Sequence, residues 1–249
     1  MHLKKLFTFL LLFSLGQSFA QDQIPAQNGN ITIQPIVHGT LVVSYQNLTI
    51  YVDPYGGVKG FEGQKPADLV LITDIHGDHH NQETLDGLDL SKATIIAPQA
   101  VAEKLPKDKY KAVVVLGNGS STDFSGAKIS AIPMYNLPET EDSRHPKGRG
   151  NGYVVDLGGK KLYFSGDTED IAEMRALKGI DAAFVCMNLP YTMDVEQAAS
   201  AVAEFKPKAV YPYHYRGTEG LSDVEKFKSL VNSAAPGVEV RLRNWYPTN

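Results

Sequence analysis

The chain lacks the features that mark several classes of protein. Its 249 residues include a single cysteine, Cys186, so an internal disulfide is excluded and stability must come from packing. Its formal net charge of -4 provides no basic surface for nucleic acid, and we expect no nucleic-acid partner. No Gly-x-Ser-x-Gly sequence is present, which argues against a serine hydrolase. The 43% hydrophobic content is typical of one large globular domain.

The first twenty residues lack an unbroken run long enough to span a membrane. Lys4 and Lys5 precede an apolar run of roughly ten residues, Leu6–Leu15, whereas a span needs about twenty. Residues 18–20 read Ser-Phe-Ala, which has the small residues of a cleavage site. We therefore predict a signal peptide over 1–20 and a single domain over 21–249, exported to the periplasm or secreted. No cysteine stands near the cleavage site to accept a lipid, so no stable membrane insertion is expected after cleavage.

Hydrophobic patterning predicts strands and helices in a repeated order. Each half of the chain begins with strands and continues with strand-helix units, which predicts two similar layers face to face, a four-layered αββα sandwich of the α/β class. A long charged loop is expected over 135–151. The expected strands are 31–37, 41–45, 48–52, 69–72, 94–97, 112–116, 128–134, 152–156, 161–165, 182–187, 209–213 and 238–242, and the expected helices are 82–88, 99–105, 171–177, 195–205 and 222–233.

The most informative stretch joins the apolar strand 69–72 to five potential metal ligands. In an extended loop, side chains at positions i and i+2 point the same way, so the first two ligands can share one ion while the next two turn toward a second. The alternative is a polar turn in which Asp78 or Asn81 caps a helix that begins near Gln82. The five ligand-type residues are Asp74, His76, Asp78, His79 and His80.

Three later residues stand where strands end. His145 lies in the long loop, Asp167 follows the strand 161–165, and His214 follows the strand 209–213. Loops at strand ends carry sites in layered α/β folds because the rigid sheet fixes the ligands. Taken singly, each could be a hydrogen-bonded histidine or a helix cap. Together with Asp74, His76, Asp78 and His79 they make seven ligands, enough for two ions that share one carboxylate.

With these residues in place, the chain resembles the metallo-β-lactamase superfamily, and within it the small single-domain hydrolases similar to ascorbate-phosphate lactonase. The similarity covers nearly all of the chain after residue 20, in the order and spacing of its short segments. They are the H-G-T turn at His38, the loop resembling H-x-x-D-H, the histidine of the long loop, F-S-G-D-T, P-Y-T-M at Pro190–Met193 and the final P-Y-H-Y.

The resemblance implies a single metallo-hydrolase domain with two divalent ions and a small-molecule substrate. Zinc is the expected metal, with manganese or iron as alternatives. His80 matches no ligand position, and His38 resembles a residue that lines the site, with a structural role at that turn equally open. The implied ligands are Asp74, His76 and His145 for the first metal, Asp78, His79 and His214 for the second, and Asp167 as the bridge.

The chain departs from the superfamily at one ligand. The superfamily's loop usually starts with histidine, where this chain has Asp74. The added carboxylate should lower the positive charge of the centre, weaken the Lewis acidity of the first metal and favour harder ions there. On this reasoning Asp74→His should raise zinc occupancy at the first site. Asp74 could also be a non-ligand, which would leave a protein with one metal.

The implied function is an exported metal-dependent hydrolase that uses a metal-activated hydroxide on an ester, lactone, phosphodiester or related bond. Asp78 or Asp167 would move the proton to the leaving group, so both are candidate catalytic residues. Lys147, Arg149 and Arg216 flank ligands and could clamp a carboxylate or phosphate of the substrate, with a solvated loop as the alternative. The second function that the sequence allows is a non-catalytic or weakly active exported protein of the same fold that binds metal or ligand.

Overall fold

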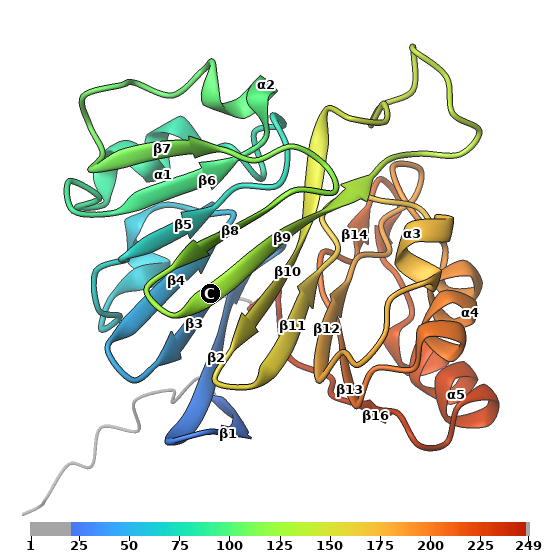
Figure 1. Ribbon diagram of the computed structural model, residues 1–249. Helices are drawn as coiled ribbons and strands as arrows, with labels where there is room; N and C mark the ends of the chain where they lie inside the picture. The colour runs from blue at the N-terminus through green and yellow to red at the C-terminus, as the bar shows by residue number, and fades with distance from the viewer. Residues whose placement is uncertain (1–20, 248–249) are drawn as a thin grey trace, which may run out of the picture.

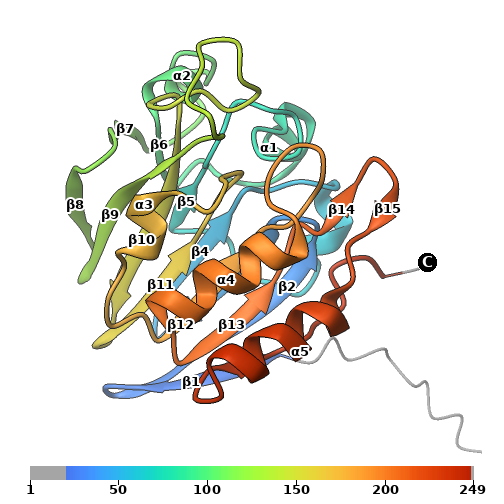
Figure 2. The ribbon, with the colours of Figure 1, turned by 90° about the vertical axis from the view of Figure 1, so that its right-hand side faces the viewer.

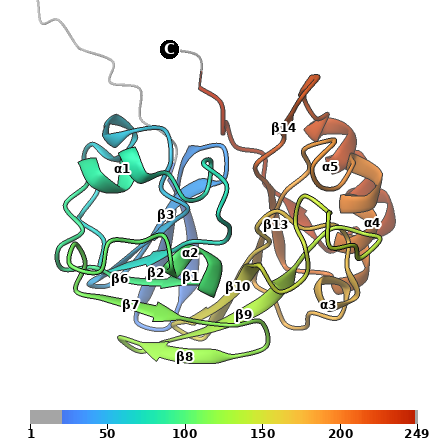
Figure 3. The same ribbon diagram turned by 90° about the horizontal axis from the view of Figure 1, so that it is seen from above.

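The computed structural model describes residues 21–247, in which two facing sheets are enclosed by helices (Figure 1). The predicted signal peptide, 1–20, lies outside the described residues. The helices are α1 (Gln82–Gly87), α2 (Gln99–Ala102), α3 (Ala172–Arg175), α4 (Val195–Phe205) and α5 (Val224–Ala234). Seen from above, α1 and α2 lie on one side of the sheets and the other three helices on the opposite side (Figure 3). The predicted four-layered sandwich is confirmed.

The first half of the chain forms one seven-stranded sheet with the order β1-β2-β3-β4-β5-β6-β7. Neighbouring strands from β1 to β4 pair antiparallel, and those from β4 to β7 pair parallel. A 3-10 turn, Val58–Phe61, follows β4. The strands are β1 (Asp22–Ala26), β2 (Gly29–Val37), β3 (Thr40–Tyr45), β4 (Leu48–Val52), β5 (Leu69–Leu71), β6 (Thr94–Ala97) and β7 (Ala112–Val115).

The second half forms a sheet of the same design. Its order is β8-β9-β10-β11-β12-β13-β16, again with four antiparallel strands followed by parallel ones. The topology therefore bears out the predicted similarity of the two halves. The strands are β8 (Ser121–Phe124), β9 (Ala127–Met134), β10 (Gly150–Leu157), β11 (Lys160–Phe164), β12 (Ala182–Val185), β13 (Ala209–Pro212) and β16 (Glu239–Val240). A small hairpin, β14 (Arg216–Gly217) and β15 (Gly220–Leu221), projects after β13 (Figure 2).

The sequence prediction missed the two edge strands β1 and β8. Both strands have one neighbour, so a polar sequence such as Ser-Thr-Asp-Phe suffices there, and Pro25 is tolerated in β1. The hairpin β14–β15 was missed as well. Helix α2 is shorter than predicted because Pro106 disfavours helix at Leu105.

The inner strands of both sheets are continuous apolar runs, because both faces of each sheet are covered. In β3, Leu41 and Val43 pack in the core between the sheets, while Val42 packs with Leu85 of α1 and Val101 of α2. The parallel strands β5, β6, β12 and β13 are buried throughout and hold no charged residue, and the charged ligands lie beyond the strand ends. Among residues 21–247, no helix combines the length and apolar character needed to cross a membrane.

We predict that Gly152→Ala destabilises the fold. A Cβ atom at Gly152 would lie 2.9 Å from the carbonyl oxygen of Ser165 and 3.0 Å from that of Phe164, and backbone atoms in a sheet cannot move aside easily. The free energy of unfolding should fall by about 1–3 kcal/mol. Gly117→Ala is the matched control, because a Cβ there would meet no atom within 4 Å. Equal stability of both variants in chemical denaturation would contradict this account.

Candidate metal centre

All seven predicted ligands come together at the carboxyl ends of the parallel strands. Two ligands follow β11 and β13, which can be traced in Figure 2, four follow β5, and the seventh comes from the loop before β10. They form two groups, in each of which one ligand atom per residue lies within 4.8 Å of the others. One group is Asp78, His79, Asp167 and His214, and the other is Asp74, His76 and His145.

Asp167 faces both groups. Its Oδ2 atom lies 3.3 Å from Nε2 of His79 and 3.3 Å from Nε2 of His145, and its Oδ1 atom lies 3.3 Å from Nε2 of His214. One buried carboxylate therefore touches histidines of both groups. This is the position that the resemblance assigned to the bridging ligand.

Hydrogen bonds to the backbone shape the loop 73–80 after β5, which carries four of the ligands and is called the ligand loop below. Thr73, at the start of the loop, donates its N–H to Oδ1 of Asp53 (2.7 Å). The backbone N–H groups of His79 and His80 both donate to the carbonyl of His76, at 3.0 and 2.8 Å. Asn81 caps α1, because its side chain accepts the N–H of residue 84. Asp78 is therefore not needed as a helix cap and contributes to the ligand group instead.

Two further residues orient ligand imidazoles. Nδ1 of His79 lies 2.8 Å from Oδ2 of Asp53, and since an ionised carboxylate only accepts, Nδ1 donates and Nε2 is the nitrogen left to face Asp167 and the other ligands. Nδ1 of His145 lies 3.1 Å from Oδ1 of Asn136, with the same consequence. Histidines that bind metals are typically held in this way. Sequence reasoning missed both partners, and the only signal was that Asp53 directly ends a strand.

Orphaned buried atoms test whether the site fits metal ions. Nε2 of His145 and Oδ1 of Asp167 are buried without a hydrogen-bond partner, although buried polar atoms are normally satisfied. Imidazole nitrogens and carboxylate oxygens are ligands that suit zinc, iron and manganese. The residues present therefore fit two divalent ions, and the donor set does not select one metal.

The charges of the cluster shift its pKa values in opposite directions. Burial opposes ionisation of Asp167, but His214 and His79 outweigh it and hold the pKa of this carboxyl well below its usual value. Burial likewise disfavours the charged form of His79, but Asp167 and Asp53 outweigh it and raise the pKa of this imidazole. The carboxylates are thus ionised at neutral pH, and a metal ion that binds here must displace a proton.

His38 supports the second group rather than standing apart from it. Its Nε2 donates to Oδ2 of Asp78 (3.1 Å), and its Nδ1 accepts from the hydroxyl of Tyr246 (2.6 Å). Its ring centroid is 3.7 Å from that of His214. Burial lowers the pKa of His38, which keeps the imidazole neutral. The contribution of Tyr246 could not be found from the sequence, because 208 positions separate it from His38.

The predicted basic clamp residues have different surroundings. Arg149 makes a bidentate ion pair with Asp74, and Lys147 lies 3.0 Å from a carboxylate oxygen of Glu139. Arg216 has no such partner among residues 21–247, and its guanidinium lies 4.3 Å from the centroid of the Tyr246 ring. Arg144, which sequence reasoning did not select, lies in the same way over Tyr191, at 4.5 Å.

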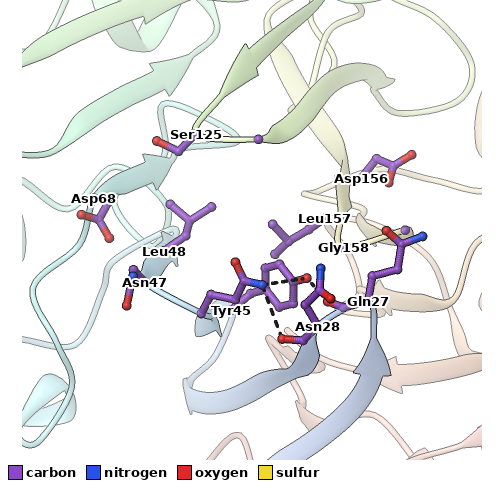
Figure 4. A pocket seen from close by; sticks show the side chains of 13 residues that line it. Gln27, Asn28, Tyr45, Asn47, Leu48, Asp68, Ser125, Asp156, Leu157 and Gly158 are labelled. Atoms are coloured by element: carbon purple, nitrogen blue, oxygen red, sulfur yellow. Dashed lines mark hydrogen bonds between the residues drawn. The ribbon is translucent and has the colours of Figure 1, made fainter.

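A polar hollow of about 470 Å³ lies at the other end of the strands, away from the ligands (Figure 4). Hairpin turns of both sheets line it, with Asn28, Tyr45, Ser125 and Asp156 among its residues (Figure 4). None of the seven ligands contributes to it. The hollow is therefore separate from the candidate metal centre.

Comparisons with known proteins identify the family and the fold of the chain. Residues 32–214 match the profile of the β-lactamase superfamily domain. A UPF0173 metal-dependent hydrolase of Pyrococcus abyssi is 33% identical over 210 residues, which are 78% of this chain and 92% of that protein. A crystal structure of a candidate metal-dependent hydrolase from Parabacteroides distasonis is 39% identical with a TM-score of 0.80, over 91% of this chain and 99% of that one. The metallo hydrolase Igni18 of Ignicoccus hospitalis, 23% identical with a TM-score of 0.73 over 86% and 95% of the two chains, has the same fold.

We predict that His79→Ala removes one metal ion from the loaded protein, because its Nε2 atom lies 3.2 Å from that of His214 and 3.3 Å from Asp167. The neighbouring variant His80→Ala should keep both ions, since His80 belongs to neither ligand group. Elemental analysis after equilibrium dialysis against buffered metal gives the stoichiometry. Loss of an ion from His80→Ala would mean that the ligands are assigned one residue out of register.

Proposed function

The chain belongs to the β-lactamase superfamily and is a metal-dependent hydrolase, and we propose that its seven ligands hold two divalent ions, most simply zinc, for the cleavage of an ester, lactone, phosphodiester or related bond. The observation that carries the proposal is the single buried carboxylate of Asp167, which touches histidines of both groups. Two divalent ions held there would acidify water and polarise the carbonyl or phosphoryl oxygen of the substrate.

The ligands divide between the two ions as the two groups do. Asp53 and Asn136 contact the Nδ1 atoms of His79 and His145, on the side of each imidazole that faces away from the centre. These rings therefore need not reorient when metal ions bind. Such fixed orientation is what a site that stabilises a developing charge requires. The first ion would take Asp74, His76 and His145, the second would take Asp78, His79 and His214, and Asp167 would serve both.

Asp78 suits proton transfer better than Asp167 does. The Asp78 side chain is 34% exposed, against 5% for Asp167, so Asp78 can exchange a proton with solvent or with a leaving group. His38 donates to one oxygen of Asp78 and fixes its direction. Asp167 contacts three imidazoles, and its ionised form is needed for their charge balance. We therefore assign the proton-transfer role to Asp78.

The substrate that we propose carries an anionic group away from the bond that is cleaved. Arg144 directly precedes His145, and Arg216 stands two positions after His214, so both arginines belong to segments that carry a ligand. Each lies over a tyrosine ring and has no carboxylate partner among residues 21–247, unlike Arg149. A guanidinium free of internal partners can bind a carboxylate or phosphate with two hydrogen bonds.

Export remains part of the proposal. Its support is the sequence of residues 1–20, where Lys4 and Lys5 precede the apolar run and small residues end it. The mature protein would then act in the periplasm or outside the cell on a small-molecule substrate.

A non-catalytic metal-binding protein is the second candidate. The observation that favours it is the ion pair of Asp74 with Arg149, which engages both oxygens of a predicted ligand. If that pair excluded the first ion, one ion would remain at the second group.

We expect about two metal equivalents per chain when the protein is purified without chelator or affinity-tag metal. Chelation should abolish hydrolysis across a panel of esters, lactones, phosphodiesters and β-lactams, and added metal should restore it, because the ions supply the water chemistry. Elemental analysis and the panel together decide between the candidates. Bound metal without turnover on any substrate would favour the non-catalytic protein.

A further prediction concerns Arg216→Gln. For an ester that carries a distant carboxylate, KM should rise about tenfold because a charge-assisted hydrogen bond is lost, while kcat stays within about twofold. Steady-state kinetics on a matched neutral ester should show no change. Lys178→Gln is the control, since this exposed lysine between α3 and β12 makes the same charge change at the opposite ends of the strands. Equal effects on both esters would contradict an anion-binding role for Arg216.

A further inference from the structure

Asp74 is the one carboxylate of the first ligand group, and Arg149 holds its side chain. Its side chain is fully buried (0% exposed), and Arg149 approaches it with two parallel hydrogen bonds, Nε to Oδ1 at 3.1 Å and Nη2 to Oδ2 at 3.0 Å. Nη2 of Arg149 also donates to the carbonyl of Arg144 (2.6 Å), which fixes the guanidinium on its other side. This fork is the geometry in which arginine binds a carboxylate most strongly.

The backbone holds the two partners together. Asn151, two residues after Arg149, donates its N–H to the carbonyl of Thr73, directly before Asp74, at 2.9 Å. Gly150 lies between, and a Cβ atom there would meet the Thr73 carbonyl at 3.0 Å. The start of β10 therefore packs directly on the base of the ligand loop. The ion pair follows from this close approach of two chain segments and is not a chance contact of a long surface side chain.

The pair leaves Asp74 able to bind a metal ion. A carboxylate has about four lone-pair sites, and the guanidinium uses one on each oxygen. Oδ2 also lies 2.7 Å from Nδ1 of His76, within the first ligand group. Arg149 therefore fixes the carboxylate plane and leaves Oδ2 directed toward the other ligands.

The pair also changes the charge of the centre. Arginine stays protonated in proteins, so Arg149 contributes one positive charge where Asp74 contributes one negative charge. When Asp74 is counted alone, as in the reasoning from sequence, it lowers the positive charge of the centre by one. When Asp74 and Arg149 are both counted, their charges cancel. The net charge of the first ligand group is then that of its neutral histidines.

We propose that Arg149 is a positioning residue for the first metal ion, which holds Asp74 as a ligand through one oxygen and cancels its charge, so that the two residues act as one neutral ligand. This inference rests on the proposed function, because it requires a metal ion at the first group. It follows that Asp74→His alone does not strengthen metal binding at the first ligand group. Asp74→His would leave Arg149 as an uncompensated cation beside the ion.

The experiment is a double-mutant cycle on metal affinity, measured in the metal-free full-length mature protein by competition with a chromogenic zinc chelator. Asp74→His should weaken the binding of the first zinc ion at least about tenfold, since a unit charge is then uncompensated a few ångströms away in a partly buried site. Arg149→Gln added to Asp74→His should restore the affinity to within about threefold of the wild type. The second zinc ion should bind equally in all variants.

Two controls separate this effect from a general change in charge or folding. Lys147→Gln in the Asp74→His background removes a positive charge from the same loop, but Lys147 is paired with Glu139 and does not contact Asp74, so it should not rescue. Asp74→Asn and Asp74→Asn/Arg149→Gln repeat the cycle with a side chain of the same size, in case the histidine variant does not fold. The double variant should again bind the first ion more tightly than the single one.

The outcomes distinguish the inference from the proposed function. If the wild-type protein binds no ion at the first group, both are overturned. If it binds two ions and Asp74→His binds the first as tightly as the wild type does, or if Arg149→Gln fails to rescue in both backgrounds, the role of Arg149 is overturned and the two-metal proposal stands.

Discussion

Asp167 is a buried carboxylate at the carboxyl ends of the strands, where the two sheets meet, and the arrangement of the site follows from the need to compensate its charge. A buried ion is costly unless it is paired. Three histidines supply the pairing, His79 from the first half of the chain and His145 and His214 from the second. Neither half carries a complete centre, so the site forms where the carboxyl ends of both sheets meet. The repeated topology of the sheets brings these ends together.

Two of the three histidines that touch Asp167, His79 and His145, are in turn held by a residue that faces away from the centre. Asp53 and Asn136 fix two imidazoles, and Tyr246 fixes His38, which holds Asp78. The contact of Tyr246 with His38 brings the C-terminal segment to the site. There the backbone carbonyl of Trp245 also accepts the backbone N–H of His38, at 3.0 Å. The superfamily profile ends at residue 214, so this support is built by residues beyond the matched segment.

The sequence located the residues of the two groups, but it did not locate the residues that support them, and the reason is physical. Asp74 to His79 are separated by one to five positions, so a local pattern describes them, and Asp167 and His214 follow strands within three residues. Asp53 and Tyr246 act only through contacts with residues 26 and 208 positions away, and no local pattern reports such contacts. Arg149 was selected for its charge, but only the structure could show that this charge is directed at a ligand. The sequence prediction missed the edge strands β1 and β8, because these strands pair on one side only and need little apolar surface.

The exposure of the ligands indicates from which side a substrate reaches the centre. Five of the seven ligand side chains are 5% exposed or less, while His76 and Asp78 are 23% and 34% exposed. These two flank Gly77, an exposed residue at which a Cβ would meet nothing within 4 Å. His76 belongs to the first group and Asp78 to the second, so both groups open toward the same loop. A substrate that approaches over Gly77 can therefore reach both ligand groups at once, and Asp78 is the member of these groups that is nearest to solvent.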